Sequence, residues 1–166
     1  MIGRMTRPTV EELARRFELE PLPLEGGLFR QMWVGEPDNE GRPVGTAIIV
    51  LLAAEGGHFS AMHRLPIDET WYFQLGDPVE LLLLDPGGKG RVAHLGPDVL
   101  GGHDLQLTVP AGTWMGARVA DDGAWSLFAT SMAPGFLPAD YEGGEADSLA
   151  AAYPAHEALI RALCRA

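Results

Sequence analysis

The sequence predicts an all-β fold, a sandwich or barrel in a single domain, and three observations lead to this prediction. Short apolar or alternating runs recur along most of the chain. Turn-forming sequences separate these runs, and the 21 glycines and 13 prolines are scattered without a low-complexity block. The length of 166 residues suits one core and is short for two, so residues 1–166 are taken as one domain.

The first predicted element is a short helix over about residues 10–18. Thr9 and Glu12 have the spacing of a capping box, in which each side chain bonds to the backbone of the other residue. Apolar residues then follow at helical spacing. A second helix, over about residues 154–164, is predicted at the other end of the chain, with Pro154 in its first turn.

Between the helices, the runs predict about nine strands. Each is bounded by glycine, proline or aspartate, the residues that favour tight turns. The predicted strands are Leu28 to Val34, Thr46 to Ala53, Phe59 to Arg64, Glu69 to Leu75, Val79 to Leu84, Arg91 to Leu95, Leu105 to Val109, Thr113 to Val119 and Trp125 to Met132.

Composition excludes several classes of partner. The formal net charge of -11, with no cluster of basic residues, argues against binding to nucleic acid or to an anionic membrane surface. No apolar run approaches the roughly 20 residues of a membrane span, and no signal-peptide pattern is found. Cys164 is the single cysteine, which excludes an internal disulfide. We therefore expect a soluble, cytoplasmic protein.

Four residues in the centre of the chain are spaced as in a known motif: Gly57, His63, Glu69 and Gly76. They resemble the first motif of the cupin superfamily, but Leu65 stands where that motif has a second histidine. The second motif is matched by Pro110-Ala111-Gly112-Thr113-Trp114-Met115, in which Met115 stands where that motif has a third histidine.

Further matches point to one branch of this superfamily, known as cupin family five or domain of unknown function 985. They cover about residues 9 to 142 in the order of that family: Glu25 to Arg30, Ser60, His63 to Leu65, Asp68-Glu69 with Trp71, 75 to 78, 110 to 114, 133 to 136 and 140 to 142. The resemblance implies a jelly-roll β-barrel over about residues 25–142 and a homodimer. It implies no defined reaction, so function has to be argued from the site.

A catalytic metal is not favoured by these residues. His63 and Glu69 would be its ligands if one binds, whereas Leu65 and Met115 offer an alkyl chain and a thioether. Zinc, iron and manganese sites usually need about three nitrogen or oxygen ligands from the protein. A divalent metal would require a further donor, for which the candidates are His58, Gln74, His94, His103 and Glu142.

A metal-free pocket could still carry out proton transfer. A carboxylate such as Glu69 can fix the tautomer of a buried His63 and make it a general base. Some cupin-fold sugar epimerases are similar in using a histidine base without metal. Such enzymes return the proton from a phenol, for which Tyr141 and Tyr72 are the candidates. Strand alternation turns Tyr72 away from the face of Glu69, which favours Tyr141.

The remaining candidates would bind the ligand. An inward-facing Arg30 could hold a carboxylate or phosphate group, although a salt bridge from Arg30 to Glu69 or Glu142 would leave the same trace in the sequence. Trp71, Phe73 and Trp114 could stack on a ligand or fill the core, and Met115 would line the same pocket.

We therefore expect a small-molecule-binding protein with a sugar-like or anionic ligand. The activity expected from these residues is metal-independent isomerisation or epimerisation, with His63 as base, Glu69 as its orienting group and Arg30 as the anion clamp. Two alternatives stay open. One is a non-catalytic binding or scaffold protein, and the other is a metal-dependent oxygenase with a reduced set of ligands.

Overall fold

All nine predicted strands form, and their ends lie within one residue of those expected. The computed structural model describes residues 7–165. The strands are β2 (Leu28–Val34), β3 (Thr46–Ala53), β4 (Ser60–Arg64), β5 (Glu69–Gly76), β6 (Val79–Leu84), β7 (Gly90–Leu95), β8 (Gln106–Val109), β9 (Trp114–Val119) and β10 (Trp125–Met132). Two further strands, β1 (Glu20–Pro21) and β11 (Glu142–Gly143), have only two residues each and leave no periodic signal in the sequence.

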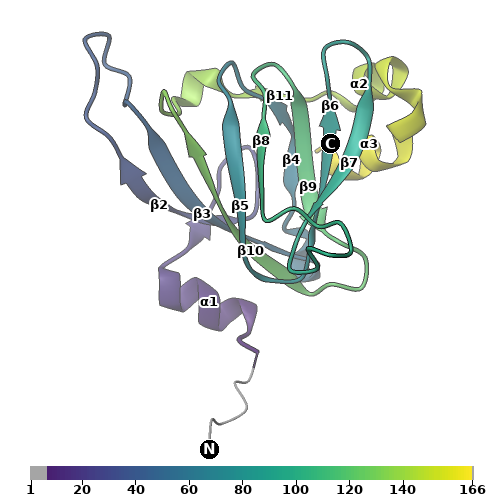
Figure 1. The fold of residues 1–166 in the computed structure, drawn as a ribbon, viewed down its shortest axis with the longest axis horizontal. Coiled ribbons are helices and arrows are strands. Elements are labelled where there is room, and N and C mark those ends of the chain that lie inside the picture. Colours follow the sequence, from purple (N-terminus) through teal and green to yellow (C-terminus); the bar gives the residue numbers. More distant parts are fainter. Residues whose placement is uncertain (1–6, 166) are drawn as a thin grey trace, which may run out of the picture.

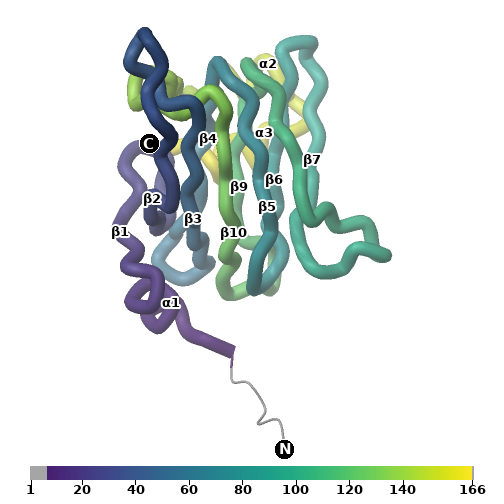
Figure 2. The backbone as a smooth tube through the Cα atoms, turned by 60° about the vertical axis from the view of Figure 1, so that its left-hand side comes forward, coloured from purple at the N-terminus to yellow at the C-terminus, as the bar shows by residue number. Residues whose placement is uncertain are grey.

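The strands form two facing antiparallel sheets, as Figures 1 and 2 show. One has the order β1-β2-β3-β10-β5-β8 and the other β11-β4-β9-β6-β7. Consecutive strands often lie in different sheets, which is the arrangement of a jelly roll. The expected jelly-roll fold is confirmed. The largest apolar cluster fills the space between the sheets and includes Trp71, Phe128 and Met115.

Strand β3 is apolar on both faces because both of its faces are covered. Val50 and Leu52 point into the space between the sheets. Ile49 and Leu51, which alternate with them, lie in an outer cluster with Leu13 of helix α1 (Val10–Phe17). Neighbouring side chains along a strand point to opposite faces. A strand with one face exposed to water therefore alternates apolar and polar residues, whereas a strand covered on both faces is apolar throughout.

Helix α1 begins as the sequence predicts. The Thr9 side chain accepts a hydrogen bond from the backbone N–H of Glu12 at 3.2 Å, and the Glu12 carboxylate accepts one from the N–H of Thr9 at 2.8 Å. The helix ends at Phe17, and Glu18 follows it in the left-handed region at φ 53°.

The helix expected over about residues 154–164 is found, and a further helix that was not expected lies before it. The structure has α2 (Ala146–Ala152), a 3-10 turn (Pro154–His156) and α3 (Glu157–Leu163). Pro154 has no N–H and disfavours helical geometry in the residue before it, so the chain breaks there. The sequence prediction missed α2 because its N-cap is Glu145, a residue less typical of this position than Ser, Thr, Asp or Asn. Two more 3-10 turns span Glu55–Gly57 and Pro138–Asp140.

Helices α2 and α3 cover the outer face of the second sheet, at the upper right of Figure 1. Ile160 and Leu163 are buried there with Leu149, against Leu82 and Leu84 of β6. The C-terminal segment therefore supplies one of the three apolar layers of the protein.

Truncating Ile160 should destabilise the whole domain. Ile160 is fully buried, and removing such a side chain leaves a cavity, so Ile160→Ala should lower the free energy of unfolding by about 2–5 kcal/mol. Urea denaturation followed by fluorescence measures this change. Leu159→Ala is the matched control, because Leu159 is only partly buried beside the same cluster. Equal effects of the two substitutions would contradict the assigned packing.

Candidate functional site

A cavity of about 350 Å³ opens at one end of the space between the sheets. Its walls come from the β1–β2 connection, from β2, β3, β5 and β10, and from the segment that precedes β11. Two of its residues, Leu24 and Phe136, are exposed apolar side chains. The lining consists of Leu22, Pro23, Leu24, Glu25, Phe29, Gln31, Thr46, Ala47, Ile48, Leu65, Glu69, Thr130, Ser131, Met132, Phe136, Pro138 and Tyr141. Most of the wall is thus apolar, with two carboxyl groups among its polar members.

Glu69 is a buried carboxyl group at the start of β5. The indole N–H of Trp71 donates to its Oε2 at 2.9 Å, and Glu69 is 6% exposed. Burial raises the pKa of Glu69 to about 7, the negative charge of Glu25 adds to this, and His63 and the hydrogen bonds from Thr130 and Trp71 oppose it. Near neutral pH, Glu69 can therefore both accept and release a proton.

Glu25 reaches the cavity from the connection between β1 and β2. Its Oε1 accepts a hydrogen bond at 2.7 Å from the hydroxyl of Ser60, which is fully buried on β4. Gly26 and Gly27 follow with φ of 102° and 80°, and a Cβ on Gly26 would lie 2.5 Å from the Phe59 carbonyl oxygen. Glycine is needed there for the bend that turns Glu25 toward the cavity.

His63 lies in the buried layer behind this cavity wall. Its Nδ1 is 2.7 Å from the carbonyl oxygen of Ala61, and because a carbonyl can only accept, Nδ1 carries the proton. The other nitrogen, Nε2, is buried without a hydrogen-bond partner among the described residues. It lies 3.9 Å from Oε2 of Glu25. The carboxylate nearest to this nitrogen is thus provided by Glu25, which the sequence analysis did not select.

Tyr141 connects His63 to the cavity. The two rings stack with centroids 5.3 Å apart and planes 14° from parallel, and Tyr141 lines the cavity. Partial burial, with the negative charge of Glu25 as a lesser cause, raises the pKa of the phenol. Tyr141 therefore keeps its proton at neutral pH and can donate it. By contrast, the Tyr72 hydroxyl lies 2.9 Å from the Ser131 hydroxyl, and its side chain does not line the cavity.

Arg30 does not reach the site. Its guanidinium pairs with Glu18 at 2.6 Å and donates to the Phe17 carbonyl oxygen at 3.2 Å, on the outer surface next to α1. Its neighbours on β2, Phe29 and Gln31, both line the cavity. Alternation then forces Arg30 to the opposite face. Neither the expected anion clamp nor a salt bridge to Glu69 or Glu142 is formed.

The other predicted ligand-binding residues are structural. Trp71 is fully buried and stacks on Phe128 at 4.6 Å, so it orients Glu69 and offers no surface to a ligand. Phe73 packs against the central core, and Met115 is buried within it. Trp114 faces the outer layer near α3, where the Arg64 guanidinium lies over its ring. None of these four side chains lines the cavity.

These residues do not fit the metal set of a cupin. Met115 pairs with His63 across β4 and β9, but it and Leu65 are buried apolar residues where the superfamily motifs have histidines. Within residues 7–165, no group of three His, Cys, Asp or Glu side chains is placed to hold a metal ion. His63 and Glu69 alone give fewer donors than such sites normally use.

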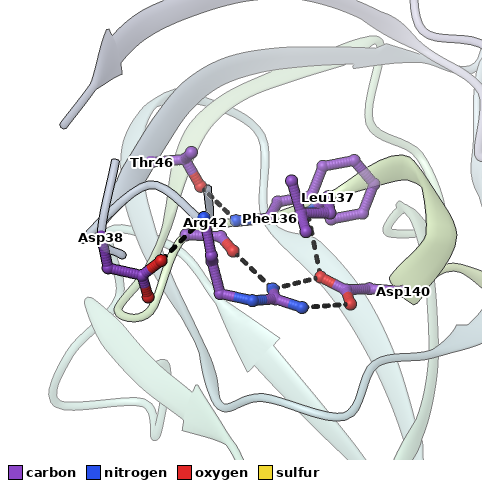
Figure 3. A network of polar contacts seen from close by, with 7 residues as sticks. Asp38, Arg42, Thr46, Phe136, Leu137 and Asp140 are labelled. Atoms are coloured by element: carbon purple, nitrogen blue, oxygen red, sulfur yellow. Dashed lines mark hydrogen bonds and ion pairs between the residues drawn. The ribbon is translucent and has the colours of Figure 1, made fainter. Parts of the chain in front are cut away.

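A polar network holds the segment that closes the cavity (Figure 3). Arg42 donates from Nη1 and Nη2 to the two oxygens of Asp140, at 2.7 and 2.9 Å, and its Nη1 also donates to the Gly135 carbonyl oxygen. The Phe136 N–H donates to the Thr46 hydroxyl, and the Leu137 N–H donates to Asp140. The Arg42 guanidinium lowers the pKa of Asp140. This network places Phe136 and Tyr141 at the cavity.

The sequence of this chain matches that of a known protein family. The model of the family described as Cupin superfamily (DUF985) matches residues 11–143. The chain belongs to this family. Among curated proteins, no significant match is found.

Solved structures agree with this membership of the cupin superfamily. A protein of Shewanella oneidensis is 32% identical, with a TM-score of 0.87 over 96% of this chain and 99% of its own. A hypothetical protein from Leishmania major is 33% identical, with a TM-score of 0.84 over 96% of this chain and 100% of its own. A cupin 2 domain-containing protein from Halorhodospira halophila is 15% identical, with a TM-score of 0.57 over 85% and 84% of the two chains, a similarity of fold alone.

Within the part of this cupin that the structure describes, no helix combines the length and the apolar character that a membrane crossing requires.

Protonation of Glu69 should make stability depend on pH. Its pKa is about 7 in the folded chain and near its ordinary 4.5 when unfolded. The folded state therefore holds this proton more tightly, and the resulting stability is complete below about pH 4.5 and is lost as the pH rises through about 7. Relative to Glu69→Gln, the wild type should lose on the order of 3 kcal/mol over this window. Urea denaturation at a series of pH values measures the difference. Glu55→Gln, at an exposed site outside the cavity, keeps Glu69 and should lose stability with rising pH as the wild type does. Parallel curves for the wild type and Glu69→Gln would contradict the raised pKa.

Loss of the Arg42 contact should loosen the wall of the cavity. In Asp140→Asn the guanidinium loses its charged, two-pronged partner, so we expect faster amide hydrogen exchange in residues 135–141 with little change in the sheets. Hydrogen exchange followed by mass spectrometry measures this. Asp147→Asn is the matched control, because Asp147 is an exposed carboxylate on α2 that pairs with Arg161 of α3, away from the cavity. Equal exchange in segment 135–141 of the wild type and Asp140→Asn would show that the network does not hold this wall.

Proposed function

We propose that this cupin binds a small carbonyl compound in the cavity and catalyses metal-independent proton transfer on it, as an isomerase or epimerase does. The observation that carries the proposal is a buried carboxyl group, Glu69, with a pKa of about 7 in the wall of an accessible cavity. A group whose pKa lies near neutrality suits both halves of a proton transfer. The roles given to His63 and Glu69 by sequence analysis change accordingly.

In the proposed reaction, Glu69 is the base. Its ionised form takes a proton from the carbon next to the substrate carbonyl, and the electron pair of the broken C–H bond moves into an enolate. Tyr141, which keeps its proton, donates a hydrogen bond to the developing oxyanion or returns a proton to carbon. When Tyr141 gives its proton, Glu69 releases the proton that it took to solvent, and the phenolate takes one up from solvent. No oxidant or reductant is needed, because the substrate only rearranges.

His63 and Glu25 act behind this step. His63 stacks on Tyr141 and its Nε2 is 3.9 Å from Glu25, so it can stabilise charge as protons move. It is buried behind the wall, and direct contact with a substrate belongs to Glu69, Glu25 and Tyr141, which line the cavity.

We keep the homodimer and the cytoplasmic location as predictions.

The structure does not favour the anionic ligand that the sequence analysis expected. That expectation depended on an inward-facing Arg30, and Arg30 lies on the outer surface beside Glu18. Among the cavity residues described, none is Lys, Arg or His, whereas two are carboxyl groups. The sugar-like ligand stays a prediction, and the cavity favours a neutral or positively charged compound.

Proton exchange with heavy water tests the proposed reaction. A panel of small hydroxy and amino ketones would be incubated with the protein in D₂O, and the loss of signals from protons next to the carbonyl would be followed by NMR. We expect exchange above background, with a rate that rises as the pH approaches about 7 and then levels off, because the ionised base is required. Glu69→Gln should lower the rate about 10²–10⁴-fold and remove this pH dependence.

Two controls identify the phenol and the role of metal. Tyr141→Phe should slow the exchange, whereas Tyr72→Phe, at the other phenol, should leave it unchanged. Protein treated with chelator and shown by plasma mass spectrometry to lack stoichiometric metal should keep its activity. Loss of exchange on chelation would favour metal-dependent chemistry instead, and ligand binding without any exchange would favour a non-catalytic binding protein.

A further inference from the structure

The polar part of the cavity has an imbalance of charge, because its lining residues include two carboxyl groups beside hydroxyl and amide side chains but no Lys, Arg or His. Glu25 and Glu69 both line it. Among the described residues, the donor to Oε1 of Glu25 is the Ser60 hydroxyl, whereas Oε2 of Glu25 is 3.9 Å from Nε2 of His63, too far for a hydrogen bond. The half-buried Glu25 therefore shares the cavity with the buried Glu69, and its Oε2 has no donor within the part of the chain that the structure describes.

His63 strengthens this imbalance. Because Nδ1 donates to the Ala61 carbonyl, Nε2 of the neutral ring presents a lone pair. This nitrogen is fully buried and lacks a partner among the described residues, and a buried polar group left unpaired costs about 1–3 kcal/mol. The site therefore contains a nitrogen acceptor aimed at a carboxylate, an arrangement that a proton or a cation would stabilise.

The charge of the cavity points the same way. Two carboxyl groups share it, the negative charge of Glu25 disfavours ionisation of Glu69, and none of its described residues brings a positive charge. Two guanidiniums near this rim are bound to the protein: that of Arg165 donates to the Glu25 backbone carbonyl oxygen at 3.4 Å, and that of Arg42 is bound to Asp140. A positively charged ligand group would relieve this repulsion.

We propose that the cavity binds protonated primary amines, with the ammonium group held by the carboxyl groups of Glu25 and Glu69 and an apolar body against the surrounding wall. An ammonium ion offers three donors and one positive charge, and none of the lining residues supplies that charge. Phe29, Ile48 and Phe136 supply apolar surface for the rest of the ligand. This inference rests on the proposed function, and it names the class of its substrate.

An ammonium group fits better than the two other donor-bearing candidates. A divalent metal needs about three close ligands in fixed geometry, and no such trio is placed within residues 7–165. A neutral hydroxyl compound could donate hydrogen bonds but would leave the repulsion between the carboxyl groups uncompensated. An ammonium group meets carboxylates over longer, less directional contacts and carries the required charge.

Three probes of matched size test the inference: benzylamine, benzyl alcohol and benzoate. Binding to the full chain would be measured by NMR titration and by calorimetry near pH 7. We expect benzylamine to bind about tenfold or more tightly than benzyl alcohol, and benzoate to bind most weakly. A cation beside Glu69 favours its ionised form, so benzylamine should also release protons, seen as a dependence of the binding heat on the ionisation enthalpy of the buffer.

Variants locate the effect. Glu25→Gln should abolish the preference for benzylamine over benzyl alcohol, and Glu69→Gln should abolish the proton release. Glu55→Gln removes the same charge outside the cavity and should change neither. Because the comparison of the three probes on the wild type needs no variant, the test stands even if Glu25→Gln folds poorly.

The outcomes separate this inference from the proposed function. Equal or tighter binding of benzyl alcohol or benzoate would overturn the amine preference and leave a cavity that binds small molecules. Amine binding that disappears with chelator would mean that a metal ion carries it, and would also overturn the inference. Amine binding without any proton exchange on carbonyl compounds would support the inference while removing the proposed catalysis. If no probe binds, the inference fails, and the exchange experiment on carbonyl compounds alone decides the proposed function.

Discussion

The burial of the Glu69 carboxyl group is the constraint around which this end of the protein is organised. An ionised carboxylate in an apolar interior is strongly disfavoured unless hydrogen bonds or charges compensate it. The indole N–H of Trp71 donates to Glu69, Thr130 adds a hydrogen bond, and burial, together with the negative charge of Glu25, raises the pKa of Glu69 to about 7. The outcome is a core in which a proton is held inside the barrel and can leave through the cavity.

The surrounding residues separate the charges of the site from the charges of the surface. Arg30 and Arg64 pair with Glu18 and Glu142 on the outside, and Arg42 is bound to Asp140 at the rim. Each guanidinium is thus used to fix a segment of chain, while the interior keeps carboxyl groups, an imidazole and a phenol. This division gives the cavity its acidic character and ties its wall segment 135–141 to Arg42 through Asp140 and the Gly135 carbonyl oxygen.

The comparisons place these features in a family without assigning them a reaction. Two solved relatives share about a third of the sequence along nearly the whole chain, whereas a wider cupin similarity at 15% identity reflects the common barrel alone. A barrel of this kind supports many chemistries. The site differs from the superfamily motifs in its side chains. Leu65 and Met115 are buried apolar residues at the positions where those motifs have histidines.

The sequence by itself determined the fold to a large extent. Turn residues and strand periodicity placed nine strands, the Thr9–Glu12 capping box placed α1, and the motifs around His63 and Glu69 identified the family, because all of these depend on contacts between near neighbours in the chain. Strand alternation on β2 could also have predicted that Arg30 faces outward, since Phe29 and Gln31 lie on the inner face. Tertiary structure alone decided the rest of the site. Glu25 lies next to His63 although the two are 38 positions apart in the sequence, and Tyr141, which stacks on His63, comes after the last long strand. No local sequence pattern predicts contacts between residues so far apart. The pKa of Glu69 likewise arises from burial and from the charge of Glu25, which are properties of the packed protein rather than of any short segment.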